Sequence, residues 1–162
     1  MAGLYQIQEA VRLRAQEITD TYAEWPCRKG CDDCCRNLAS IPQVTSPEWE
    51  LLAAALDALP LEVAEGVRQR IRENAGRPRP VSCPLLDTRT GSCLVYQARP
   101  VACRAYGFYA ERQYVLGCAR IETLAGEGHG VVWGNHTALE ERLQGLGTQA
   151  KLSEWMSGGY GG

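Results

Sequence analysis

Four cysteines close to the N-terminus constrain this chain more than any other feature. They follow the pattern Cys27-x3-Cys31-x2-Cys34-Cys35. Thiolates two or three residues apart converge on one soft metal when the backbone turns tightly, and Gly30 permits such a turn. Cys34 and Cys35 are adjacent, and neighbouring side chains diverge from the backbone. We therefore expect this group to bind metal, with Cys34 and Cys35 facing two separate centres or shells.

A second group of four cysteines lies farther along the chain, at Cys83, Cys93, Cys103 and Cys118. The eight cysteines suffice for two tetrahedral four-cysteine zinc sites. They also suffice for one iron–sulfur cluster with four ligands, which leaves four cysteines for packing or a second metal. Cysteine is often buried, so Cys83, Cys93 or Cys118 taken singly is also compatible with a core position. The count alone leaves the metal, zinc or iron, undecided.

The surroundings of these cysteines favour metal over disulfides. The first sixteen residues mix charged and apolar positions, which excludes the continuous apolar segment of a signal peptide. No apolar run approaches the roughly 20 residues of a membrane span. We therefore expect a cytoplasmic protein, where thiols stay reduced and clustered cysteines bind metal or carry out redox chemistry.

Composition excludes several other classes of protein. The chain has 162 residues, is 45% hydrophobic and 22% charged, and carries a formal net charge of −2. These values indicate a globular chain of one domain rather than a disordered one. A slightly acidic chain has no general basic field for phosphate contacts, so we expect no nucleic-acid partner.

Helical periodicity covers much of the chain outside the cysteine segments. Apolar residues at three- and four-residue steps predict helices over residues 3–22, 46–74 and 136–146. Pro60 divides the middle stretch into two helices that pack as a hairpin. A short helix is also expected over residues 93–98.

These segments predict a mainly α fold, a small irregular helical domain organised around a cysteine-ligated metal centre. The expected domain spans residues 1–157, with a cysteine cluster at 27–36, a helical insertion at 46–74 and a second cysteine segment at 81–120. Residues 158–162 are rich in glycine and are expected to form a flexible tail. The two histidines, His129 and His136, are expected in a loop and at a helix start rather than as ligands.

The order of motifs resembles a known bacterial family. The resemblance rests on Cys27-x3-Cys31-x2-Cys34-Cys35-Arg36, Cys83-Pro84-x-Leu86, Cys93-x2-Tyr96-x2-Arg99-Pro100-x2-Cys103-Arg104 and Cys118. This pattern is similar to the YkgJ-like cysteine-cluster family, described as zinc- or iron-chelating, and spans about residues 27–120. The resemblance implies that the eight cysteines form the metal site.

Two enzyme classes share part of the pattern. Flagellin lysine N-methylases, in which an iron–sulfur centre and S-adenosylmethionine are implicated, have a similar cysteine pattern, but this chain is short and has no glycine-rich nucleotide loop. The spacing of Cys27, Cys31 and Cys34 also matches radical S-adenosylmethionine enzymes. Those enzymes build on a barrel that needs roughly 200 residues or more and alternating strands and helices, which this sequence does not show.

Charge balance suggests which residues surround the metal. Two four-thiolate sites with divalent ions carry a net charge of roughly −4, and donors near the sulfurs stabilise such centres. Arg99 and Arg104 belong to the family-like motif and are predicted to lie beside the cysteines. Tyr96 lies three residues from both Cys93 and Arg99, so it shares a helical face with them and is expected to pack nearby.

Three functions remain open at this point. The first is a structural or partner-binding module, in which protein ligands close every metal position and an unknown protein is bound. The second is an iron–sulfur-dependent modification or redox enzyme, which needs an open coordination position or a pocket beside the cluster. The third is a protein that handles zinc or iron and exchanges the ion. No catalytic residue is assigned, because no Ser-His-Asp pattern or phosphate loop occurs.

Overall fold

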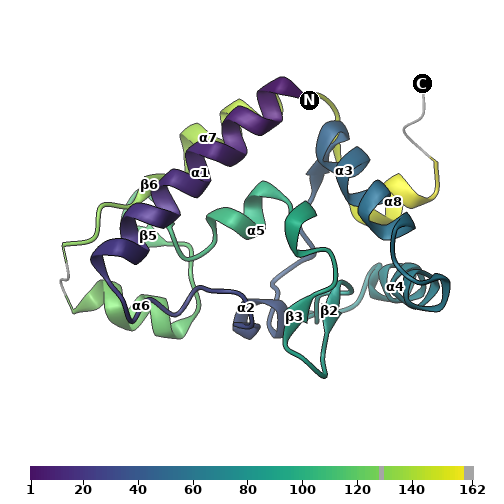
Figure 1. Ribbon diagram of the computed structural model, residues 1–162, viewed down its shortest axis with the longest axis horizontal. Helices are drawn as coiled ribbons and strands as arrows, with labels where there is room; N and C mark the ends of the chain where they lie inside the picture. Colours follow the sequence, from purple (N-terminus) through teal and green to yellow (C-terminus); the bar gives the residue numbers. More distant parts are fainter. Residues whose placement is uncertain (128–129, 159–162) are drawn as a thin grey trace.

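The computed structural model describes residues 1–127 and 130–158, and it is mainly helical, as predicted (Figure 1). The helices are α1 (Ala2–Thr21), α2 (Asp33–Arg36), α3 (Ser46–Asp57), α4 (Leu61–Asn74), the 3₁₀ helix η1 (Tyr96–Ala98), α5 (Val101–Ala105), α6 (Ala119–Gly126), α7 (His136–Gln144) and α8 (Leu152–Met156). The strands are β1 (Val44–Thr45), β2 (Leu86–Asp87), β3 (Ser92–Cys93), β4 (Tyr109–Glu111), β5 (Tyr114–Val115), β6 (Gly134–Asn135) and β7 (Gln149–Ala150).

The expected long helices are present with small shifts at their ends. The helix expected over 3–22 is α1, and the one expected over 136–146 is α7, which begins at His136. The helical insertion at 46–74 is α3 and α4, with Pro60 immediately before α4. The domain boundary at residue 157 stays a prediction, and both His129 and tail residues 159–162 lie outside the described residues.

The helix expected over residues 93–98 is wrong at its start. Cys93 lies in β3 and pairs with Leu86 of β2 in an antiparallel hairpin. Gly91 has a φ of +67°, and this left-handed residue reverses the chain ahead of β3. Only Tyr96–Ala98 are helical, as a single 3₁₀ turn.

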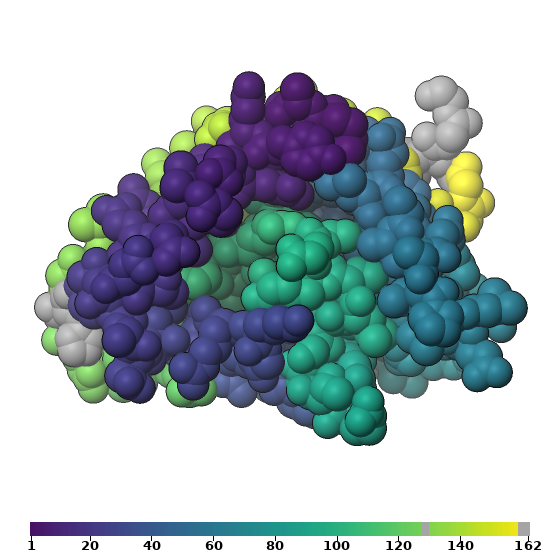
Figure 2. Space-filling view, in the orientation of Figure 1, coloured from purple at the N-terminus to yellow at the C-terminus, as the bar shows by residue number. Residues whose placement is uncertain are grey.

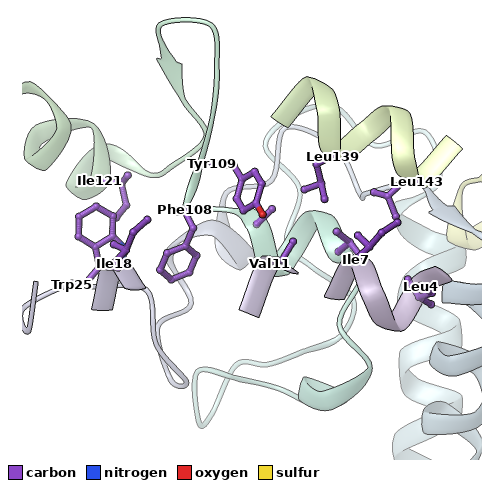
Figure 3. Close-up of a cluster of buried hydrophobic side chains, with 12 residues drawn as sticks. Leu4, Ile7, Val11, Ile18, Trp25, Phe108, Tyr109, Ile121, Leu139 and Leu143 are labelled. Carbon is purple, nitrogen blue, oxygen red and sulfur yellow. The ribbon is translucent and has the colours of Figure 1, made fainter. Parts of the chain in front are cut away.

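Two hydrophobic cores divide the molecule. The first lies between α1, α5, α6, α7 and β4, and Figure 3 shows its labelled side chains in a row that extends from Leu4 to Trp25. Its buried residues are Leu4, Ile7, Val11, Ile18, Trp25, Val101, Ala105, Phe108, Tyr109, Ile121, Leu139 and Leu143. We call this part the α1 half.

The second core lies between α3, α4, α8 and the β2–β3 hairpin, on the other side of Figure 1. Its buried residues are Val44, Leu52, Leu56, Val67, Ile71, Leu85, Val95 and Leu152. We call this part the α4 half. The strands β1 and β7 pair beside it, with Val44 opposite Ala150.

A buried carboxylate connects the two halves. Glu48, on the first turn of α3, is only 4% exposed. Its Oε2 accepts hydrogen bonds from the backbone N–H (2.9 Å) and the hydroxyl (2.8 Å) of Thr45, and its Oε1 accepts one from the N–H of Val101 (2.8 Å). Because Val101 begins α5, the carboxylate fixes the start of α3 against the start of α5.

The described residues include no helix with the length and apolar character needed to cross a membrane.

Candidate metal centre

The first cysteine group lies on a tight turn followed by α2. The N–H of Cys31 donates to the carbonyl of Arg28 (3.0 Å), and Gly30 between them has a φ of +93°. Cys34 and Cys35 both lie on α2, where their Sγ atoms are 4.0 Å apart. The helix α2 lies low and central in Figure 1, between the α1 half and the α4 half. The sequence therefore places two adjacent thiols at the junction of the two halves.

Backbone pairing brings the second group to α2. The N–H of Cys83 donates to the carbonyl of Cys35 (2.7 Å). An isolated antiparallel bridge between Leu38 and Val81 supports this contact through two hydrogen bonds of 3.0 and 2.9 Å. The β2–β3 hairpin then returns the chain and carries Cys93 to the same region. Segments far apart in sequence are thus held beside α2.

A glycine allows Cys27 to approach the chain around residue 107. Gly107 has a φ of +85°, and a Cβ atom added there would lie 2.2 Å from the Sγ of Cys27. The carbonyl of Gly107 also accepts a hydrogen bond from the indole of Trp25 (3.2 Å). Only glycine leaves room for the sulfur at this position. Cys118 precedes α6, and its carbonyl accepts from the N–H of Glu122 (3.0 Å).

The electrostatic neighbours of Cys27 define one set of thiols. Burial raises the pKa of Cys27 to about 12, and repulsion from the thiolate forms of Cys31, Cys118 and Cys34 adds to this. The pKa of Cys31 is also raised, first by burial and further by Cys34 and Cys118. We call Cys27, Cys31, Cys34 and Cys118 the cleft set.

The remaining four thiols form a second set. Burial raises the pKa of Cys103 to about 12, with further repulsion from Cys35 and Cys93 and also from Cys34 of the cleft set. The hydrogen bond between Cys34 and Cys35 lowers the pKa of Cys35, but a hydrogen bond to Cys83 and burial raise it to about 12 overall. We call Cys35, Cys83, Cys93 and Cys103 the hairpin set.

The sets divide between the two cores. Cys27 and Cys118 pack against the core of the α1 half, whereas Cys83 and Cys93 pack against the core of the α4 half. Cys34 and Cys35 belong to different sets, although their Sγ atoms lie only 4.0 Å apart. The two sets meet at this pair, since the hydrogen bond to Cys35, together with burial, raises the pKa of Cys34.

The thiol donors suit a soft metal, although in this structure the sulfurs of neither set surround a common point. Four thiols per set match the ligand number and type of zinc and iron–sulfur sites. Across residues 1–127 and 130–158, no three Cys, His, Asp or Glu side chains are close enough to hold one ion as they stand. Metal binding in either set would therefore draw the sulfurs closer together, and the ligand roles of the eight cysteines stay predictions.

The predicted neighbours of the cysteines form a small stack. The guanidinium of Arg99 lies over the ring of Tyr96, 3.5 Å from its centroid, and its Nε donates to the carbonyl of Tyr96 (3.0 Å). The Nε of Arg104 donates to the carbonyl of Arg99 (2.8 Å). Burial raises the pKa of Cys93 and of Cys103, and the charge of Arg99 partly opposes this rise in both. Arg99 therefore acts on the hairpin set.

A cleft of about 240 Å³ opens beside the cysteines. All four thiols of the cleft set line it, whereas the hairpin set contributes only Cys103. The opposite wall is α1, and Figure 2 shows the surface hollowed between purple α1 and the teal segment that carries η1 and α5. The α1 residues in this wall are Gln8, Val11, Arg12, Ala15, Gln16 and Thr19.

Sequence reasoning missed this contribution of α1. The apolar stripe of α1 predicted which of its residues enter the core. Residues at the border of that stripe carry no sequence signal that they line a cleft. It also treated Glu48 only as an acid at a helix start, although the carboxylate is buried and joins two helices.

Comparisons with known proteins place the chain in a family. No curated protein and no solved structure matched it. A family model described as "CxxCxxCC: Putative zinc- or iron-chelating domain" matches residues 26–121, more than half of the chain. The resemblance drawn from the cysteine pattern is thereby confirmed at the level of the domain. The chain belongs to the CxxCxxCC family of zinc- or iron-chelating domains.

Proposed function

We propose that the protein chelates two metal centres, zinc or iron, one in the cleft set and one in the hairpin set. The observation that supports this most is the placement of the cysteines. All four thiols of the cleft set line the cleft, whereas Cys83 and Cys93 pack against the core of the α4 half and the N–H of Cys83 donates to the carbonyl of Cys35. Four thiolates complete a tetrahedral zinc site, and they are also the usual ligands of an iron–sulfur cluster.

Each centre would cross-link segments that are far apart in the sequence. The cleft set joins the turn at residues 27–34 to the start of α6, and the hairpin set joins α2 to the β2–β3 hairpin and α5. A bound metal supplies bonds that replace the mutual repulsion of the thiolates. This role favours a structural or partner-binding module, whose partner is an unknown protein.

The arginine and tyrosine neighbours support the charge balance of these centres. Arg99 and Arg104 would offset part of the negative charge of the hairpin set, and Tyr96 holds the Arg99 guanidinium in place by stacking. The thiols are free, and a reducing compartment such as the cytoplasm would keep them available for metal.

A specific observation favours a second candidate, an iron–sulfur-dependent modification or redox enzyme. The cleft brings a solvent-filled space to all four thiols of the cleft set. A small molecule in that space would reach the metal centre, which a purely structural site does not require. This candidate needs iron with labile sulfide in the cleft set.

Metal analysis of protein purified without oxygen tests the proposal. We expect two metal centres per chain by mass spectrometry of the elements, with a visible absorption spectrum recorded on the same sample. Two zinc ions without colour would support the module, whereas brown protein containing iron and labile sulfide would support the enzyme. Protein that folds and binds neither metal would contradict the proposal.

A further inference from the structure

We propose that the cleft binds a small anionic ligand, one that carries a carboxylate or a phosphate, through the guanidinium groups of Arg28, Arg99 and Arg104. The inference deepens the proposed function and rests on it in one respect, because the ligand would lie against the metal centre of the cleft set. The arginines themselves are present whether or not metal is bound.

The size and walls of the cleft suit a small ligand. Its volume of about 240 Å³ is below the range of about 300–1,000 Å³ that holds drug-sized molecules. The α1 wall offers apolar contacts from Val11 and Ala15 and an amide from Gln8, and Phe108 lies in the lining as well. A molecule of the size of an amino acid or a small dicarboxylic acid fits this mixture of polar and apolar contacts.

Apart from the cysteines, the charged side chains of the cleft are mostly basic. The lining contains four arginines, at positions 12, 28, 99 and 104, and one carboxylate, Asp33. Arg12 is held by Glu9 through two hydrogen bonds of 2.8 Å each, and Asp33 lies 3.8 Å from Arg120 outside the cleft. The other three arginines have no carboxylate within 4.0 Å in the part of the chain that the structure describes.

Arg99 and Arg104 form the centre of this charge. Among the described residues, the only hydrogen bond of the Arg99 side chain runs from its Nε, so both terminal amino groups keep their donors. Arg104 donates to the carbonyls of Arg99 and Gln97. Two half-buried guanidinium groups with free donors provide a site for a bidentate oxyanion.

The arginines also lie near the thiols of the proposed metal centres. Offsetting the charge of metal-bound thiolates is therefore a competing role for them. If they only offset the charge of the metal-bound sulfurs, an added anion would find no net attraction in the cleft. The two roles differ in what a substitution changes. Loss of an anion site weakens ligand binding at constant metal content, whereas loss of charge balance lowers the metal content of the hairpin set.

Titration of the protein tests the inference. The protein as purified without oxygen is titrated with succinate and, separately, with inorganic phosphate, and binding is followed by calorimetry and by amide chemical shifts. We compare wild type with Arg99→Gln and Arg28→Gln, and the control is Arg72→Gln on the exposed face of α4. Metal content is measured for each sample.

We expect saturable binding of at least one probe, with shift changes in α1 and in residues 96–108. A hydrogen bond to a charged partner contributes roughly 1.5–3 kcal/mol, so Arg99→Gln should raise the dissociation constant by about tenfold or more. Arg28→Gln should also raise the dissociation constant, and it provides the test if Arg99→Gln fails to fold. Arg72→Gln should leave the dissociation constant unchanged.

Each outcome decides a different question. Preference for succinate would identify an organic acid, and preference for phosphate would identify a phosphorylated ligand or phosphate itself. Absence of saturable binding of both probes, or equal weakening by Arg72→Gln, would overturn the inference even if two metals are bound. Protein without metal that still binds a probe through Arg99 would contradict the proposed function and leave the anion site standing.

Discussion

The two halves of the molecule are built alike but present their cysteines differently. Each half has its own hydrophobic core, and two thiols pack against each core, Cys27 and Cys118 in the α1 half and Cys83 and Cys93 in the α4 half. The cleft set lies along an open cleft beneath α1, whereas three of the four thiols in the hairpin set lie outside its lining. Both sets are placed to stabilise the fold by binding metal, but only the cleft set is open to a small molecule.

The junction between the halves is short and specific. Cys34 and Cys35 lie side by side on α2, yet they belong to different sets, and Glu48 joins α3 to α5 across the same boundary. Loss of Glu48, which has hydrogen-bond partners in both halves, should therefore affect both, while loss of any one thiol, Cys34 and Cys35 included, should affect mainly one half.

Removal of the metal should have the largest effect. Structural zinc contributes an apparent binding energy of about 10–16 kcal/mol in small peptides, so chelation should lower the Tm by at least about 10 °C. Calorimetry measures the change, and hydrogen exchange should rise over residues 27–36 and 81–120. An unchanged Tm after complete metal removal would contradict the role of metal in the fold.

The metal-free protein should also respond to pH in a characteristic direction. The folded pKa of Cys27, Cys35 and Cys103 is raised from 9.0 to about 12. A raised folded pKa means that stability is present below pH 9 and is lost as the pH rises toward 12, because the unfolded thiols ionise first. Urea unfolding of metal-free protein at pH 7.5 and pH 9.5 measures this. Equal stability at both pH values would show that the thiols are not buried together.

Loss of one thiol should remove one centre and destabilise one half. Cys31→Ser should reduce the metal content by half and raise hydrogen exchange around α6, whereas Cys93→Ser should do so around α4 and the hairpin. Ser92→Ala, one residue before Cys93 in β3, is the control and should keep both centres. If both cysteine variants loosened the same half, the assignment of sets to halves would be wrong.

Removal of the buried carboxylate should destabilise both halves without removing metal ligands. Glu48→Ala leaves the N–H of Thr45, its hydroxyl and the N–H of Val101 without their acceptor, at about 1–3 kcal/mol for each buried group. We expect a loss of about 3–5 kcal/mol in the free energy of unfolding, measured with urea. Glu50→Ala, on the exposed side of α3, should change it by less than about 0.5 kcal/mol. Similar changes in the free energy of unfolding for the two variants would show that Glu48 does not join the two halves.

A glycine pair isolates the contact between the chain and Cys27. Gly107→Ala and Gly76→Ala both place a side chain at positive φ, +85° and +82°, which costs about 1–3 kcal/mol. Only at Gly107 does the new Cβ meet a sulfur, 2.2 Å from Cys27 Sγ, whereas at Gly76 it meets nothing within 4 Å. Gly107→Ala alone should therefore lower the affinity of the cleft set for metal, measured by competition with a chelator. Equal affinity in the two variants would show that Cys27 is not a ligand.

The sequence predicted the elements that depend on residues close together in the chain. Apolar spacing predicted α1, α3, α4 and α7, and Pro60 predicted the break between two of them. The spacing of residues 27–35 predicted the turn, whereas the assignment of Cys34 and Cys35 to separate centres stays a prediction. Each of these signals is contained within a few turns of chain.

Features that depend on distant residues could not be predicted in the same way. Two-residue strands such as β2 and β3 are too short to show alternation, so Cys93 was assigned to a helix. The division of the eight cysteines depends on the Leu38 and Val81 bridge and on the close approach of Gly107 to Cys27. The cleft depends on how α1 lies over α5, which no single segment encodes.

The most direct test compares Cys34→Ser with Cys35→Ser in protein purified without oxygen. Metal content and hydrogen exchange are measured on both variants and on wild type. The account predicts that each variant keeps one centre, with Cys34→Ser loosening the α1 half and Cys35→Ser loosening the α4 half. Loss of all metal in both variants, with the same segments loosened, would mean that the two thiols serve a single centre and would contradict the account.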